Sequence, residues 1–203
     1  MLEILPVGEV QHFWLEYLRY ELEEYFGDVI ISPPIEVPLS FNERGQVLAD
    51  HLLDHLNRYP ACAEKVLAVI DRDITVSGVD YIFGLAALGG RCAVISPVRL
   101  REVYYNRECD YELFLERLLK EAMHELGHTL GLTHCNNESC NMKFSSTVYE
   151  IDRKSLLFCD DCLNTVFGYA KVQDTRVYAA NGEGSKNLMR TILDRLKKIQ
   201  KKK

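Results

Sequence analysis

The sequence predicts an α/β protein with a mixed, mostly parallel sheet, followed by an irregular half. Two observations lead to this prediction. Strand-like and helix-like patterns alternate over residues 2–71, the order that produces parallel strands joined by crossover helices. After Gly131 the hydrophobic periodicity stops, and residues 132–165 are rich in Cys, Asn, Ser and Asp. A segment of this kind needs something other than a hydrophobic core to stabilise it.

Apolar spacing and turn residues place the individual elements. Apolar residues at three- and four-residue steps predict helices, and Gly27 and Pro60 end the first two of them. The continuous apolar run at 66–70 predicts a strand buried on both faces, and Asp110 is a suitable N-cap for the third helix. The expected strands are 2–7, 29–32, 35–39, 65–71, 79–85 and 91–96, and the expected helices are 10–26, 45–59 and 111–130.

Composition excludes several protein classes. The chain has 203 residues, of which 47% are hydrophobic and 27% charged, as in ordinary globular proteins. Residues 81–98 form the longest stretch with few charges, but its glycines and proline argue against a membrane-spanning helix. The first residues lack the basic flank and apolar run of a signal peptide, so a cytoplasmic location is expected.

Charge is unevenly distributed along the chain. The net charge is −6, but residues 185–203 contain eight basic residues and one acidic residue, so the remainder is strongly acidic. An acidic body argues against nucleic-acid binding. We expect a basic tail at 171–203 containing an amphipathic helix, which either docks on the acidic body or binds a partner or an anionic surface.

The strongest chemical signal is the run HELGH at residues 124–128, followed by Gly131 and His134. On a helix, residues four apart share a face, so His124 and His128 can reach one ion. Gly131 can end the helix in a left-handed conformation and turn the chain, which lets His134 become a third ligand. Three neutral imidazoles and one water are typical of a catalytic zinc site.

Glu125 lies about 100° round the helix from His124, where it can act on a metal-bound water without being a ligand. The leucines of this helix occupy the opposite half, so we expect the imidazoles to face a cleft. An accidental spacing of surface or core histidines is the competing interpretation, and the fixed positions make it rare. His51 and His55 are also four apart, but they lack the Glu and the third ligand, so we interpret them as part of a solvated face.

Four of the seven cysteines form two close pairs about twenty residues apart, the spacing of a structural zinc site. These are Cys135, Cys140, Cys159 and Cys162. Two disulfides or buried free thiols are the alternatives. A second zinc would supply the folding free energy that the irregular segment lacks. The remaining cysteines, Cys62, Cys92 and Cys109, are isolated and are expected to be ordinary thiols.

The arrangement His-Glu-x-x-His-x-x-Gly-x-x-His is the metzincin zinc signature. Its continuation through Cys135, Cys140 and Met142 to the pair at 159 and 162 closely resembles the archaemetzincins. Upstream, residues 71–73, 83–86 and 96–100 look similar to the sheet region of that family.

The resemblance implies a compact metzincin-like domain over residues 1–170, with the sheet and active-site helix in 1–131 and a zinc-stabilised irregular half in 132–170. It implies that His124, His128 and His134 hold the catalytic zinc, that Glu125 is the general base and acid, and that the four cysteines hold a structural zinc. Met142 would lie in a Met-turn beneath the catalytic ion. An antiparallel edge strand at 79–86 or its neighbour would hold an extended substrate.

The predicted function is a zinc-dependent metallopeptidase that hydrolyses peptide bonds by Glu-assisted attack of a zinc-bound water. Two zinc ions per chain, a peptide or protein substrate and a monomeric state are expected. A proteolytically silent, zinc-containing peptide-binding or regulatory module is the alternative from a different class. A zinc hydrolase acting on a non-peptide amide or ester is a third.

Overall fold

The computed structural model of the protein describes residues 1–60 and 63–166. Cys62, the last residues of the expected catalytic domain and the basic tail at 171–203 lie outside these described residues.

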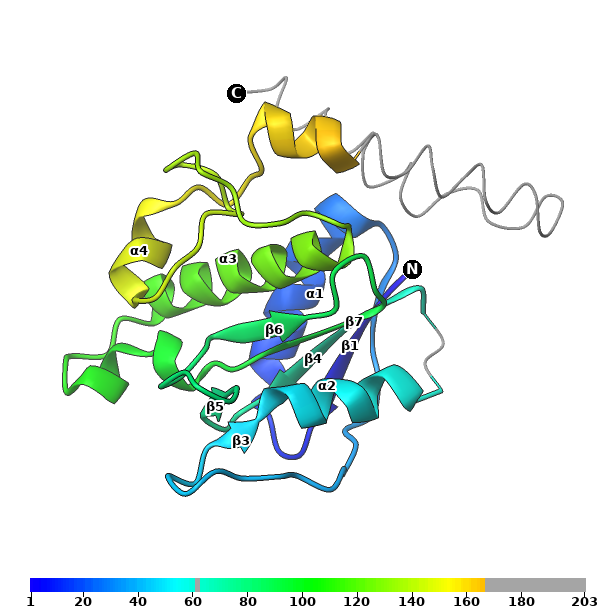
Figure 1. The fold of residues 1–203 in the computed structure, drawn as a ribbon, viewed down its shortest axis with the longest axis vertical. Helices are drawn as coiled ribbons and strands as arrows, with labels where there is room; N and C mark the ends of the chain where they lie inside the picture. The colour runs from blue at the N-terminus through cyan, green and yellow to red at the C-terminus, as the bar shows by residue number, and fades with distance from the viewer. Residues whose placement is uncertain (61–62, 167–203) are drawn as a thin grey trace, which may run out of the picture.

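A five-stranded sheet forms the centre of the fold (Figure 1). Its strand order is β2-β1-β4-β7-β6. The first four strands pair in parallel, and β6 pairs antiparallel with β7 at the edge. The prediction of a mixed, mostly parallel sheet is therefore confirmed. The strands are β1 (Leu2–Val7), β2 (Val29–Ile31), β4 (Lys65–Ile70), β6 (Gly84–Ala86) and β7 (Cys92–Ile95).

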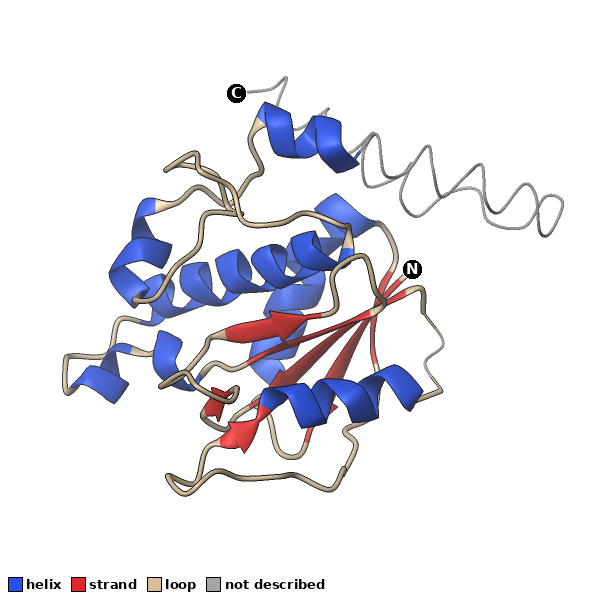
Figure 2. Cartoon of the chain, in the orientation of Figure 1, coloured by secondary structure: helices blue, strands red, loops and turns tan. Residues whose placement is uncertain are grey.

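Helices cover both faces of the sheet, in a three-layer arrangement (Figure 2). Helices α1 (His12–Phe26) and α3 (Tyr111–Thr129) lie on one face, and α2 (Ala49–Arg58) lies on the other. Side chains of β4 alternate between them, since Leu67 and Val69 pack with α1 and α3 while Val66 faces α2. Burial on both faces explains why this strand is a continuous apolar run.

One expected helix is shorter than predicted and one expected strand is absent, because of long-range pairing and proline. The helix expected at 45–59 starts only at Ala49, because Val47–Leu48 form strand β3 and pair with β5 (Ile74–Thr75). The strand expected at 35–39 is wrong, and only Ile35 pairs, in a single bridge with Val7. The prolines before and within this segment have no N–H to donate to a ladder.

The strand expected at 79–85 is also displaced, since β6 covers only Gly84–Ala86. Ile82 instead makes a single bridge to Ile74 in β5. Residues 79–81 instead line a cleft, described below.

Helix α3 lies between the sheet and the segment 132–166. It starts as predicted, because a side-chain oxygen of Asp110 accepts a hydrogen bond from the Leu113 N–H at 2.9 Å. The segment 132–166 is mostly loop, but it contains the short helix α4 (Val148–Arg153) and a helical stretch at 160–166. Short 3₁₀ turns at Val98–Leu100 and Glu102–Tyr105 connect β7 toward α3. In the described part of the chain no helix has the length and apolar character needed to cross a membrane.

Candidate active site

The three histidines of the predicted site come together at one point. The ligand nitrogens of His124, His128 and His134 all lie within 4.8 Å of one another. The Nε2 atoms of His124 and His128 are 3.2 Å apart. A tetrahedral zinc with bonds of 2.0–2.1 Å would separate two nitrogens by about 3.3 Å. The spacing of this pair therefore fits two ligands of one zinc ion, and the third histidine lies close enough to join them.

Backbone carbonyls fix the orientation of the two helical imidazoles. Nδ1 of His124 lies 2.8 Å from the Asn141 carbonyl oxygen, and Nδ1 of His128 lies 2.7 Å from that of Leu132. A carbonyl oxygen can only accept, so each Nδ1 carries the proton and each Nε2 has a free lone pair. Burial lowers the pKa of both rings, with nearby positive charge adding to the effect on His124, so both are neutral near pH 7.

Gly131 brings the third histidine to the site, as the sequence predicts. Helix α3 ends at Thr129, and Gly131 follows with a φ of 89°, a conformation that other residues rarely adopt. The Leu132 N–H donates back to the Gly127 carbonyl at 3.1 Å, which closes the turn. The chain then reverses, and the His134 ring packs 5.1 Å from the ring of Phe144.

Glu125 is buried, with 4% of its surface exposed, and lies beside the histidines in the same cleft. Its Oε2 atom is buried and has no hydrogen-bond partner among the described residues. Burial, followed by the neighbouring Glu121 carboxylate, raises the pKa of Glu125 well above its ordinary value. A buried acceptor without a partner is costly, so a group that donates to it is expected in the working protein.

The histidines and Glu125 open into a cleft of about 540 Å³, which confirms the expected placement of the imidazoles. One wall is formed by residues 79–88, including the edge strand β6, and the other by residues 144–146 and Lys154. The walls are largely apolar, the composition that suits a ligand-binding site. Their apolar side chains include Val79, Tyr81, Ile82, Phe83, Leu85, Leu88 and Phe144.

Two charged residues at the site were not predicted from the sequence. Lys154 is 2% exposed and its Nζ lies 3.4 Å from Nδ1 of His124. That Nδ1 already donates to Asn141. Burial lowers the pKa of Lys154, and the nearby carboxylates of Glu121 and Glu125 oppose that shift. Glu121 lies one turn before Glu125 on α3, a spacing that could have identified it. Lys154 follows α4 and has no comparable local signal.

Met142 is fully buried, and its sulfur lies against Gly127 of α3. A Cβ at Gly127 would overlap the Met142 Sδ and would lie 3.1 Å from the Phe158 ring. The glycine therefore allows the chain around Met142 to approach the helix between its two histidines. The role of Met142 beneath the metal remains a prediction.

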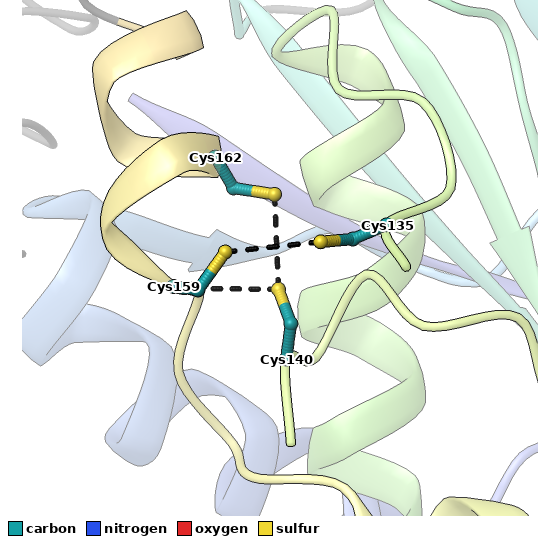
Figure 3. Close-up of side chains that lie close together, drawn as sticks. All are labelled: Cys135, Cys140, Cys159 and Cys162. Atoms are coloured by element: carbon teal, nitrogen blue, oxygen red, sulfur yellow. Dashed lines mark hydrogen bonds between the residues drawn. The ribbon is translucent and has the colours of Figure 1, made fainter. Parts of the chain in front are cut away.

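The four predicted cysteine ligands form a second cluster, in which the sulfurs converge (Figure 3). The Sγ atoms of Cys135 and Cys159 are 3.8 Å apart, and those of Cys140 and Cys162 are 3.7 Å apart. Four sulfurs at 2.3 Å from a tetrahedral zinc are separated by about 3.8 Å. The cluster matches that geometry, and the separations are far from the bond of about 2.05 Å in a disulfide.

The surroundings of the sulfurs also fit a metal site. The Cys159 N–H lies 3.3 Å from the Cys140 sulfur, and the Asn137 N–H lies 3.4 Å from the Cys135 sulfur, so backbone donors face the positions of thiolates. Burial raises the pKa of the Cys140 thiol to about 11.

The other candidate ligands stay apart from both clusters. Cys92 is buried in the core, and Cys109 is exposed, in agreement with the expectation of ordinary thiols. His51 and His55 are exposed and join no cluster of metal-ligating residues within the described ranges.

Comparisons with known proteins agree with this geometry. Residues 42–167 match the model of peptidase family M54. The archaemetzincin of Methanocaldococcus jannaschii is 37% identical over 177 residues, which cover 86% of this chain and 94% of the relative. The archaemetzincin of Pyrococcus abyssi is 39% identical over 173 residues, covering 80% and 92%.

A solved structure is similar over nearly the same length. The crystal structure of archaemetzincin from Methanopyrus kandleri has a TM-score of 0.72 and 35% identity, covering 84% of this chain and 96% of that one. The family model is that of a peptidase family, and the relatives and the solved structure are archaemetzincins, which favours the peptidase over the silent binding module. The chain therefore belongs to peptidase family M54 and is a zinc-dependent metallopeptidase of the archaemetzincin type.

Proposed function

We propose that Glu125 is the general base and acid of the peptidase, and that His124, His128 and His134 hold its catalytic zinc. The observation that supports this most strongly is the buried, unpartnered Oε2 of Glu125 in the same cleft as three imidazoles. When bound, zinc supplies a Lewis acid that acidifies water and polarises the scissile carbonyl.

The protein's own residues then handle the proton. Glu125 accepts a proton from the attacking water at its free carboxylate oxygen and delivers it to the leaving amine. Lys154 supplies a balancing positive charge beside the two buried carboxylates. Met142 forms an apolar floor under the histidines.

Substitution of Glu125 by alanine tests this assignment. We expect the variant to keep its zinc but to lose at least about 100-fold in turnover, the contribution typical of general acid–base catalysis. Glu116→Ala is the matched control, because this glutamate lies on the same helix but is exposed and ion-paired with Lys120. Cleavage of a broad peptide library by each protein, with and without a chelator, measures the effect. Parental turnover by the Glu125 variant would exclude it as the base.

We also propose a second, structural zinc held by Cys135, Cys140, Cys159 and Cys162, giving two zinc ions per chain. The sulfur separations support it. Residues 1–170 would form one catalytic domain, followed by a separate basic tail at 171–203. A monomer acting in the cytoplasm completes the proposal, and the free thiols of the described cysteines suit that compartment, where disulfides are rare.

A further inference from the structure

A hydrogen bond joins the two walls of the cleft. The Tyr81 hydroxyl, from the wall that contains β6, donates to the Ser146 backbone carbonyl on the opposite wall at 2.6 Å. Both residues line the cleft, and they are 65 positions apart in the sequence. An extended peptide that lies in the cleft and continues past this point meets the bond.

The Tyr81 end of the bond is held by a stack of charged and aromatic groups. The Arg99 guanidinium lies 4.0 Å from the centre of the Tyr81 ring, and Arg99 donates two hydrogen bonds of 2.6 and 2.7 Å to Asp73. The Phe83 ring contacts Tyr81 edge-on, with centroids 5.5 Å apart. Contacts on two sides of the ring restrict its rotation, so the hydroxyl is preorganised to reach across the cleft.

The Ser146 end is fixed by the start of α4. Both the N–H and the hydroxyl of Ser146 donate to the Glu150 Oε2, at 2.7 and 2.9 Å. Glu150 also forms a capping box with Thr147, which ties the same carboxylate to the helix terminus. The donor side chain and the acceptor backbone carbonyl are therefore both held in place by their neighbours.

The position of the bond relative to the catalytic centre follows from Gly84. A Cβ at Gly84 would lie 2.5 Å from the Glu125 Cγ, so Gly84 lies directly beside Glu125, the proposed base. Tyr81 precedes it by three residues, at most about 10 Å along an extended chain. Strand β6 is the edge of the sheet, and a peptide adds to such an edge most stably in the antiparallel direction. The C-terminal part of that peptide then points toward Tyr81.

We propose that Tyr81 and the Ser146 backbone form a strap that limits the substrate to about three residues beyond the scissile bond, at the spacing of an extended chain. This inference rests on the proposed peptidase function and adds a length preference to it. Peptides cleaved near their C-termini fit beneath the strap. Longer C-terminal extensions must break the Tyr81–Ser146 bond before they bind.

Binding of peptide hydroxamates tests the strap without requiring turnover. A hydroxamate group anchors on the catalytic zinc, and chains of one to six alanine residues extend from it on the C-terminal side. For the zinc-loaded full chain we expect affinity to rise up to about three residues and then to fall about fivefold, the value of one net hydrogen bond. Calorimetry gives the dissociation constant at each length.

Tyr81→Phe is the decisive variant, because it keeps the ring on Arg99 and removes only the hydroxyl. We expect its affinity not to fall beyond three residues. Tyr105→Phe is the matched control, since its hydroxyl also donates to a backbone carbonyl, that of Arg99 at 2.9 Å, but lies outside the cleft lining. It should behave like the parent protein.

The outcomes separate the strap from the catalytic assignment. A length dependence that is absent in the parent, or unchanged in Tyr81→Phe, overturns the strap even if the protein cleaves peptides. A length dependence that disappears in Tyr81→Phe supports the strap even if Glu125→Ala retains turnover. Failure of every hydroxamate to bind, whatever its length, overturns the proposed histidine zinc site, and the strap that rests on it.

Discussion

Two glycines allow buried side chains beside the cleft to approach the backbone closely. Gly84 lies against the side chain of Glu125, and Gly127 lies against Met142 and Phe158. At both positions a single added methyl group would overlap atoms of a buried neighbour that is surrounded by protein. These glycines are needed for close approach rather than for unusual backbone angles, since neither has a positive φ.

Gly84→Ala is expected to displace the base. The new Cβ would lie 2.5 Å from the Glu125 Cγ, so the carboxylate must move by roughly 1 Å, a shift that can cost about 100-fold in rate. The three atoms nearest to the added methyl group all belong to Glu125 and none to a histidine, so the zinc content should not change. Steady-state kinetics and elemental analysis of the same sample measure both effects. Unchanged kcat would contradict the placement of Glu125 against β6.

At the scale of elements, the end of α3 that carries His128 is held by the sheet. The Lys65 ammonium, at the start of β4, donates to the carbonyls of Thr129 at 2.7 Å and Gly90 at 2.6 Å. The Gly89 N–H donates to the His128 carbonyl at 2.8 Å. Carbonyls in the last turn of a helix have no partner within the helix. Here Lys65 of β4 and the turn between β6 and β7 supply such partners and hold the end of the helix beside the cleft.

Lys65→Met tests this connection. Methionine keeps most of the apolar stem but leaves the two carbonyls without their ammonium partner, so we expect the free energy of unfolding to fall by about 1–3 kcal/mol. Urea denaturation measures the change. Lys143→Met is the control, because Lys143 pairs with Glu138, whose side chain is 86% exposed, and such pairs contribute little. Equal stability of the two variants would show that Lys65 does not hold the helix end.

At the scale of the whole molecule, the sequence predicts what depends on local spacing. The layers follow from periodicity, and the two clusters of histidine and cysteine side chains follow from helical spacing, one glycine turn and paired cysteines. Pairing between distant residues could not be predicted, as the strand β3 and the Tyr81–Ser146 bond show. Buried charges were missed for the same reason. Arg117 is 1% exposed and donates hydrogen bonds to both Glu102 and Asp152. From sequence alone, a charged side chain is expected at the surface.

The histidine cluster and the cysteine cluster differ in how far the surrounding structure depends on zinc, and this difference predicts the effect of removing each site. Two of the three histidines, His124 and His128, lie on α3, which is buried along most of its length from Arg117 to Thr129, so we expect the position of this helix not to depend on zinc. The cysteines join the loop at 135–140 to the helical stretch at 160–166, in a segment with little regular structure. Structural zinc can supply most of the folding free energy of such a segment.

We therefore expect two zinc ions in the parent protein and one in a variant with all three histidines replaced by alanine. That variant should retain its hydrogen-exchange protection over residues 132–166. A Cys140→Ser, Cys162→Ser variant should lose one zinc and the protection of that segment, while the amides of β1 and β4 stay protected, because the sheet has its own core. Elemental analysis measures the zinc content of the three proteins, and hydrogen exchange measures the protection of their amides. Loss of sheet protection together with the segment would show that the thiolate site supports the whole fold, and full protection in the cysteine variant would remove its structural role.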